Sequence, residues 1–221
     1  MKNILIVGSG GHAKCVIDIL HAMEGYSILG CVADDSDPGR SVLGVPIVGT
    51  LSALKQFSAR DYKVAIGVGG WKDINERKRL FNQVISLGFD VISPIHPAAR
   101  IAPSAQIGMG ATVFSGVDIG PDVHIGKNVM VGTASFISHE TVVEEHTLIS
   151  AGVNLGGNVA VGASCLIAIG ATVASRVRIG DGTLVAAGAV VVGDTPPFSR
   201  VMGVPAKVCY GALNSRNSRN T

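Results

Sequence analysis

Aliphatic residues recur at every sixth position between residues 95 and 191. The series is Ile95, Ile101, Ile107, Val113, Ile119, Ile125, Val131, Ile137, Val143, Ile149, Leu155, Val161, Ile167, Val173, Ile179, Val185 and Val191. A small or β-branched residue stands four positions after each member, from Ala99 to Thr195. An amphipathic α-helix would space apolar residues by three and four, and a half-buried strand by two. A period of six instead predicts a left-handed parallel β-helix of triangular cross-section.

Each hexapeptide would supply one side and one corner of that triangle, so the seventeen repeats make between five and six coils. The aliphatic and the small residue of each repeat should point inward, with glycine at several corners. No repeat carries an insertion, so we expect no long loop to project. Stacked coils pair their backbone groups with one another, and only the ends of such a stack need capping. We assign residues 94–208 to this domain.

The first ninety residues show the alternation of a small α/β domain. Strands are expected over residues 4–7, 28–33, 63–66 and 90–92, and helices over residues 14–20 and 74–86. This order predicts a half-Rossmann-like parallel sheet covered by helices, which we assign to residues 1–93. Residues 209–221 form a polar tail that we expect to be disordered.

The turn after the first strand is a candidate anion site. Gly8, Gly10 and Ala13 fit the pattern G-x-G-x-x-A, in which glycines let the backbone approach phosphates and a helix N-terminus offers free N–H groups. This motif fits NAD and a nucleotide sugar equally well, but ninety residues are half of a dinucleotide fold and favour the smaller ligand. The alternatives are that the glycines only permit a tight turn and that Asp34 and Asp35 are solvated loop residues.

Composition narrows the classes of function. The chain has 18 lysines and arginines against 16 acidic residues, a net charge of +2, which leaves no basic footprint for nucleic acid. The first apolar run is too short for a secretory signal or a membrane span. The 4 cysteines are widely spaced, without a CxxC pair. We therefore expect a cytoplasmic protein that binds neither nucleic acid nor membrane.

The six-residue repeat resembles that of the hexapeptide-repeat acyltransferases over about 100 residues. With the Gly-Ser-Gly-Gly-His turn in a short α/β domain before it, the chain is similar to the sialic acid O-acetyltransferase and bacterial nucleotide-amino-sugar N-acetyltransferase family. This resemblance implies acetyl-CoA-dependent N-acetylation of the 4-amino group of a UDP- or GDP-linked 4-amino-4,6-dideoxy sugar, for surface glycans. It also implies a homotrimer with acetyl-CoA between subunits and no metal. The alternative within the family is O-acetylation of sialic acid.

The resemblance also implies roles for particular residues. The nucleotide sugar would bind at the glycine turn and at two neighbouring loops. Its phosphates or its sugar would lie at the turn, and its nucleobase and ribose would lie near Asp34 and Asp35. The residues of this site would be Gly10, Gly11, His12, Asp34, Asp35 and Gly67. Acetyl-CoA would contact later coils, at Leu148, Ile169, Ala187 and Gly188.

His139 is the candidate catalytic base. It stands two residues after the inward Ile137, so its side chain should leave the core, and Glu140 adjoins it. Acetyl transfer needs a base for the nucleophile's proton, and a neighbouring carboxylate raises imidazole basicity and orients the ring. The resemblance makes His139 the base and Glu140 its partner. His124 and His146 lack such a pairing, and we interpret them as solvated.

The chain departs from the family pattern at one position, and two other classes of function are possible alternatives. Relatives often carry Asn-Thr where this chain has Gly132-Thr133, so the role of that asparagine is absent or filled elsewhere. A zinc hydratase on the same β-helix would need His124, His139 and His146 to converge across a subunit boundary. A non-catalytic scaffold that binds nucleotide sugars is the other alternative.

Overall fold

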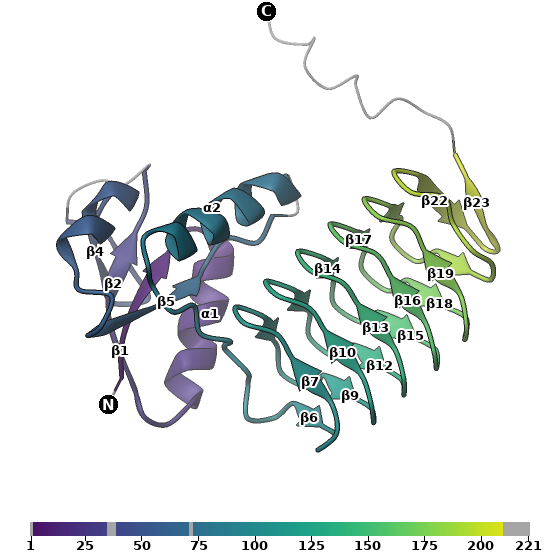
Figure 1. The fold of residues 1–221 in the computed structure, drawn as a ribbon, viewed down its shortest axis with the longest axis horizontal. Helices are drawn as coiled ribbons and strands as arrows, with labels where there is room; N and C mark the ends of the chain where they lie inside the picture. Colours follow the sequence, from purple (N-terminus) through teal and green to yellow (C-terminus); the bar gives the residue numbers. More distant parts are fainter. Residues whose placement is uncertain (1, 35–38, 71–72, 210–221) are drawn as a thin grey trace, which may run out of the picture.

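The computed structural model describes residues 2–34, 39–70 and 73–209 and shows two parts side by side (Figure 1). An α/β domain stands next to the first coils of a triangular parallel β-helix, and the later coils run away from it. Asp35 and residues 210–221 of the expected tail lie outside the described residues. Within the described ranges, no helix has the length and hydropathy of a membrane span.

The α/β domain contains a five-stranded sheet with the order β3-β4-β2-β1-β5. Its elements are β1 (Lys2–Val7), α1 (Gly11–Ala22), β2 (Tyr26–Val32), β3 (Ser41–Val42), β4 (Val45–Gly49), the 3-10 helix η1 (Leu51–Gln56), β5 (Tyr62–Ile66) and α2 (Ile74–Ser86). All pairings are parallel except that of β3 with β4 at the edge.

The strand β1 lies inside the sheet between β2 and β5, and residues 4–7 are buried on both faces, which is why this part of its sequence is continuously apolar. Ile4 and Ile6 pack with α1, whereas Leu5 and Val7 pack in the cluster that contains Leu80, Phe81 and Val84 of α2. The alternation of a strand thus distributes one apolar run between two helical layers.

The sheet differs from the sequence prediction at two places. The expected strand over residues 90–92 is only a single bridge, between Val64 and Val91. The hairpin of β3 and β4 and the helix η1 were not predicted. Because β4 is short and contains Pro46, its local sequence is that of a loop, and only its pairing with β2 makes it a strand.

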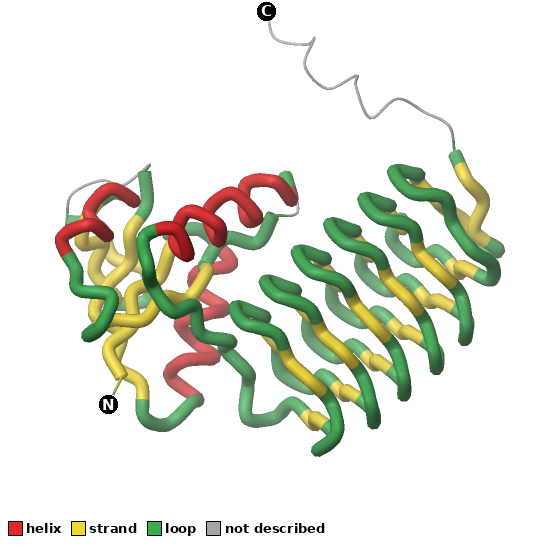
Figure 2. Tube along the Cα trace, viewed as in Figure 1, coloured by secondary structure: helices red, strands yellow, loops and turns green. Residues whose placement is uncertain are grey.

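The β-helix consists of two-residue strands in three parallel sheets, which appear as three columns of short strands in Figure 2. The first face has β7 (Gln106–Ile107), β10 (His124–Ile125), β13 (Val142–Val143), β16 (Ala160–Val161) and β19 (Arg178–Ile179). The second face has β8 (Thr112–Val113), β11 (Met130–Val131), β14 (Leu148–Ile149), β17 (Leu166–Ile167), β20 (Leu184–Val185) and β22 (Arg200–Gly203). The third face has β6 (Arg100–Ile101), β9 (Asp118–Ile119), β12 (Phe136–Ile137), β15 (Asn154–Leu155), β18 (Thr172–Val173) and β21 (Val190–Val191).

The predicted inward positions form the core of this stack. From Ile101 to Val191, the aliphatic residue of every repeat is the second residue of a strand, and Ile95 bridges to Val113. Many of the residues that stand four positions after the inward aliphatic residue also belong to the core cluster. Buried hydroxyls at that position are satisfied between coils: Thr147 donates to the Gly162 carbonyl at 2.8 Å and accepts from the Cys165 N–H at 3.0 Å.

The corners require two special backbone features. In each repeat from residue 110 to residue 188, the third residue after the inward aliphatic has φ between +55° and +72°. The residue two positions before this left-handed residue is often glycine, because the next coil approaches its backbone closely. A Cβ on Gly132, for example, would lie 2.6 Å from the backbone nitrogen of Ala151. Glycine at position 132 is therefore a packing requirement in this chain.

The last coil ends in an antiparallel hairpin, in which β23 (Ala206–Val208) folds back on β22. The hairpin turns the chain at the edge of the second face, so that the parallel stack does not continue. This is the capping that an open end of a β-helix needs.

Arg77 of α2 joins the two domains. Its side chain is 1% exposed, and its guanidinium donates to the carbonyls of Val68 at 2.6 Å and Ile66 at 3.3 Å in its own domain. On the β-helix it donates to the Thr112 hydroxyl at 3.3 Å, the Asn128 carbonyl at 3.4 Å and the Gly110 carbonyl at 3.5 Å. One buried cation therefore binds both parts.

Two histidines pack into the same junction. Nε2 of His12 lies 3.3 Å from Nη1 of Arg77, and its ring is 5.7 Å from that of Phe114. His146, which the sequence interpretation left in solvent, is instead 5% exposed and packs edge-on against Phe81. That interpretation is wrong because the α/β domain covers this corner of the β-helix. Burial and the Arg77 charge lower the pKa of His12 to about 3, and burial lowers the pKa of His146.

The buried histidines predict that stability falls in mild acid. Both are held neutral in the folded chain, so the unfolded chain binds more protons below pH 6.5, and stability declines as the pH falls from there toward 3. One such histidine contributes up to about 1.4 kcal/mol per pH unit. Urea unfolding at pH 7 and pH 5 measures the loss. His12→Gln, which keeps an acceptor for Arg77, should reduce this loss of stability, whereas His124→Gln on the surface should not. An equal loss in the wild type and both variants would contradict a buried, neutral His12.

Candidate active site

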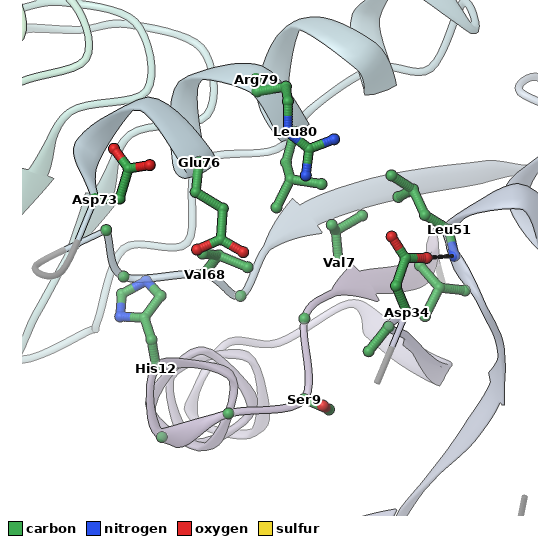
Figure 3. Close-up of a pocket in the computed structure, with 18 residues that line it drawn as sticks. Val7, Ser9, His12, Asp34, Leu51, Val68, Asp73, Glu76, Arg79 and Leu80 are labelled. Atoms are coloured by element: carbon green, nitrogen blue, oxygen red, sulfur yellow. Dashed lines mark hydrogen bonds between the residues drawn. The ribbon is translucent and has the colours of Figure 1, made fainter. Parts of the chain in front are cut away.

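A cavity of about 560 Å³ opens in the α/β domain at the carboxyl ends of β1, β2 and β5 (Figure 3). The turn after β1 forms its floor, α2 lies opposite this turn, and the loop of residues 67–70 after β5 lies between the two. Parallel α/β sheets bind ligands at this edge because the loops after successive strands meet there. Of the substrate residues named from the sequence, Gly10, Gly11, His12, Asp34 and Gly67 line the cavity.

The glycines of the site fall into two groups. Gly8 has φ +115° and a Cβ there would lie 2.8 Å from the Gly67 carbonyl oxygen, while a Cβ on Gly67 would lie 2.7 Å from Ile6. These two glycines are required by the packing of the chain. A Cβ on Gly10 or Gly11, by contrast, would meet no atom within 4 Å. Neither packing nor backbone conformation requires glycine at those two positions, and the space that they leave belongs to the cavity.

The N-terminus of α1 faces this space. Gly10 is the N-cap and supplies no side-chain hydrogen bond, and the first turn of the helix contains no acidic residue. The free N–H groups and the positive end of the helix dipole are therefore available to an anion. Arg79, which lines the cavity from α2, adds a positive charge. A phosphate group is the ligand that this arrangement suits.

Carboxylates line the remaining walls. Asp34 lies after β2, and its Oδ1 accepts a hydrogen bond of 3.0 Å from the Leu51 N–H, which orients the group (Figure 3). Asp73, the N-cap of α2, and Glu76 in its first turn also line the cavity. The sequence interpretation missed the α2 wall because charged residues on an amphipathic helix are usually solvated, and only the tertiary fold brings this helix over the turn.

His139 lies on the β-helix, at the corner between β12 and β13. Its side chain is 59% exposed, and its Nδ1 is 3.0 Å from Oε2 of Glu140. Neighbouring coils hold the backbone on both sides: the His139 carbonyl accepts from Asn158 N–H at 2.9 Å, and Glu140 N–H donates to the Pro121 carbonyl at 2.9 Å. Glu140 has φ +57°, so the left-handed corner places the carboxylate beside the ring.

The His139 ring lies over Gly157 in the next coil. A Cβ on Gly157 would be 2.5 Å from Nε2 of His139 and meets no other residue among its three nearest atoms. Phe136 and Val142, three residues before and after His139, are exposed at 42% and 37%. The corner thus presents an oriented imidazole between two apolar side chains.

The cavity and His139 lie on opposite sides of the β-helix within one chain. The α/β domain contacts the second face and the corner beside it, at Gly110, Thr112, Phe114, Asn128, His146 and Leu148. His139 lies at the corner between the third and first faces. In a triangular cross-section that corner is opposite the second face.

The residues expected at acetyl-CoA lie elsewhere again. Ile169, 61% exposed, is at the corner between the second and third faces, and the exposed Ala187 and Gly188 are at the same corner one coil further on. Leu148 is fully buried on the second face, where it packs toward Gly70 of the α/β domain. Its side chain is therefore part of the domain junction. Within the described residues of one chain, no three His, Cys, Asp or Glu side chains gather as metal ligands would.

Residues 3–84 match the family model of the PglD N-terminal domain. The structure is similar to perosamine N-acetyltransferase from Caulobacter crescentus, in complex with CoA and GDP-perosamine, with 34% identity, a TM-score of 0.88 and coverage of 95% of this chain and 97% of that one. It is also similar to the acetyltransferase domain of PglB from Neisseria gonorrhoeae, in complex with acetyl coenzyme A, with 31% identity, a TM-score of 0.89 and coverage of 94% and 99%. A comparison with curated protein sequences gave no match.

These likenesses extend over both domains, and they confirm the predicted α/β domain and left-handed β-helix. At this identity and coverage, the chain belongs to the hexapeptide-repeat acyltransferases with a PglD N-terminal domain, the family of the nucleotide-amino-sugar N-acetyltransferases.

Proposed function

We propose that this protein transfers the acetyl group of acetyl-CoA to the 4-amino group of a nucleotide-linked 4-amino-4,6-dideoxy sugar, in the synthesis of surface glycans. The observation that carries the proposal is the open glycine turn at the N-terminus of α1, which leaves room for a diphosphate in a chain that also exposes an oriented histidine. Similarity to an enzyme in complex with CoA and GDP-perosamine supports it. The cytoplasm, where acetyl-CoA and nucleotide sugars are available, is the proposed location.

His139 acts as the base in this proposal. Glu140 accepts from Nδ1–H of His139, which leaves Nε2 with a free lone pair for a proton. The neutral amine attacks the thioester carbonyl carbon, and His139 takes a proton from the amine nitrogen. Collapse of the tetrahedral intermediate breaks the C–S bond, and the proton passes to the departing CoA sulfur. The products are the acetamido sugar and CoA.

A homotrimer completes the proposed site. Because the cavity and His139 lie on opposite sides of one β-helix, a sugar held by one chain can reach the His139 only of another copy. Exposed apolar residues occur near that corner and at the acetyl-CoA corner, as Phe136, Val142 and Ile169. We propose that acetyl-CoA lies in the groove between copies, along Ile169, Ala187 and Gly188, with Leu148 contributing through its backbone alone.

Substrate class is tested with a panel of nucleotides and nucleotide sugars. We expect UDP- or GDP-linked 4-amino sugars to raise the melting temperature and to trigger thiol release from acetyl-CoA, with the product identified by mass spectrometry. Thiol release with a sialic acid alone would point to O-acetylation. Stabilisation by NAD alone, or nucleotide-sugar binding without any acetyl transfer, would contradict the proposal.

Replacement of the base should abolish turnover and leave binding intact. His139→Ala is expected to lower kcat by about 10²- to 10⁴-fold, the usual contribution of a general base, with unchanged dissociation constants for the nucleotide sugar and CoA. Steady-state kinetics and calorimetry measure the two effects. His124→Ala, another exposed histidine on the β-helix, is the control and should keep wild-type kcat. Wild-type turnover by His139→Ala would show that another group is the base.

Gly157→Ala tests the position of the His139 ring without removing it. The added methyl group would lie 2.5 Å from Nε2 and displace the ring, so kcat should fall at least tenfold. The melting temperature should change little, because the neighbour that must move is an exposed side chain. Gly193→Ala, where a Cβ meets no atom within 4 Å, is the matched control. Equal kcat values for the two variants would refute a requirement for this ring position.

A further inference from the structure

Arg77 is a buried cation without an acidic partner. None of the ion pairs among the described residues includes it, and the junction surrounds it with carbonyls, a hydroxyl and an imidazole. Burial lowers the pKa of Arg77 to about 9, so that the guanidinium stays charged at neutral pH. A charge of this kind is costly to bury, and its hydrogen bonds must compensate for the loss of water. The arrangement of its partners is therefore tightly constrained.

That constraint determines the tautomer of His12. A guanidinium has five N–H donors and no acceptor. Nε2 of His12, 3.3 Å from Nη1 of Arg77, must therefore accept the hydrogen bond between them. In a neutral imidazole the other nitrogen then carries the proton, and Nδ1 becomes a donor. The two nitrogens of His12 thus have different tasks: Nε2 faces the domain junction, and Nδ1 remains for another partner.

The same ring borders the cavity. His12 is in the first turn of α1, next to the open Gly10 and Gly11, and it lines the cavity with Gly69 and Gly70 (Figure 3). Its ring packs on Phe114 of the β-helix, and the Gly69 backbone lies so close that a Cβ there would be 3.5 Å from the His12 Cβ and 3.9 Å from Nδ1. The other neutral tautomer would place the Nε2–H against the guanidinium, where two donors cannot pair.

We propose that Arg77 fixes His12 in the Nδ1–H tautomer, and that this N–H donates a hydrogen bond to an acceptor oxygen of the bound nucleotide sugar. The oxygen belongs to the diphosphate or to a sugar hydroxyl. The second half rests on the proposed function, whereas the tautomer does not. Arg77 is then a positioning residue: it touches no substrate, but it aims His12 and, through Val68 and Ile66, holds the cavity loop against the β-helix.

The tautomer is measured first, in the wild-type protein without ligand. Long-range ¹⁵N–¹H spectra of ¹⁵N-histidine-labelled protein, with His12 assigned from the His12→Gln spectrum, should show protonated Nδ1 and unprotonated Nε2. Arg77→Met should populate the Nε2–H form, and Arg60→Met, which removes an exposed arginine of the same domain, should not. A wild-type His12 protonated on Nε2 alone would overturn the inference, and this result does not depend on whether Arg77→Met folds.

Two substitutions then separate the tasks of the ring. The amide of His12→Asn places a donor near the position of Nδ1, and that of His12→Gln places an acceptor near the position of Nε2. We expect His12→Gln to weaken nucleotide-sugar binding by about tenfold, as for one hydrogen bond to a charged oxygen, and His12→Asn to weaken it less. If His12→Gln weakens the binding of UDP or GDP as much as the binding of the nucleotide sugar, the acceptor oxygen belongs to the diphosphate. If it weakens only the binding of the nucleotide sugar, the oxygen belongs to the sugar.

The outcomes separate the two proposals. If the wild type binds nucleotide sugars and His12→Gln binds them equally well, the donor role of His12 is refuted and the proposed function stands. If the wild type binds no nucleotide or nucleotide sugar, the proposed function fails, and the ligand half of this inference fails with it. Calorimetry at fixed pH 7.5 gives the dissociation constants for all three proteins.

Discussion

The close approach of one coil to the next is the constraint on which the rest of the structure depends. Each coil pairs its backbone with residues eighteen positions away, as Phe136 does with Asn154, and this register continues from β6 to β21. The repeat must therefore hold its register without insertion, adopt a left-handed residue at each corner from residue 110 to residue 188 and often place glycine where the next coil approaches. The non-glycine residues at those corners each incur about 1–2 kcal/mol of backbone strain, which the pairing of the whole stack offsets.

This backbone pairing explains how a β-helix without loops can orient the proposed catalytic groups. The corner that gives Glu140 its positive φ also turns its carboxylate toward the ring of His139, and the next coil supplies Gly157 beneath that ring. No dedicated loop is needed, because each group is held by the same backbone pairing that builds the fold. The backbone positions of His139 and Glu140 are therefore held by the stack itself.

The junction extends this order to the α/β domain. A packing of apolar side chains alone would allow the domain to shift over the second face, but Arg77 donates to atoms of both parts, in directions that the planar guanidinium dictates. The cavity loop and His12 are tied to the same group, so the cavity and the β-helix move together. A buried charge without an acidic partner costs stability, and in this protein it provides orientation.

The sequence by itself determined the β-helix, its inward residues and the His139–Glu140 pair, because a strict period of six has one structural solution and an outward histidine can be counted from an inward Ile137. It also identified the glycine turn, although it could not distinguish Gly8 and Gly67, which packing requires, from Gly10 and Gly11, which leave the cavity open. Only the tertiary structure decided that Asp73, Glu76 and Arg79 line the cavity, that His146 is buried and that Arg77 contacts His12. These facts arise from contacts between segments far apart in the chain. The local sequence around a charged helix or a histidine does not show which other segment will pack against that helix or that histidine.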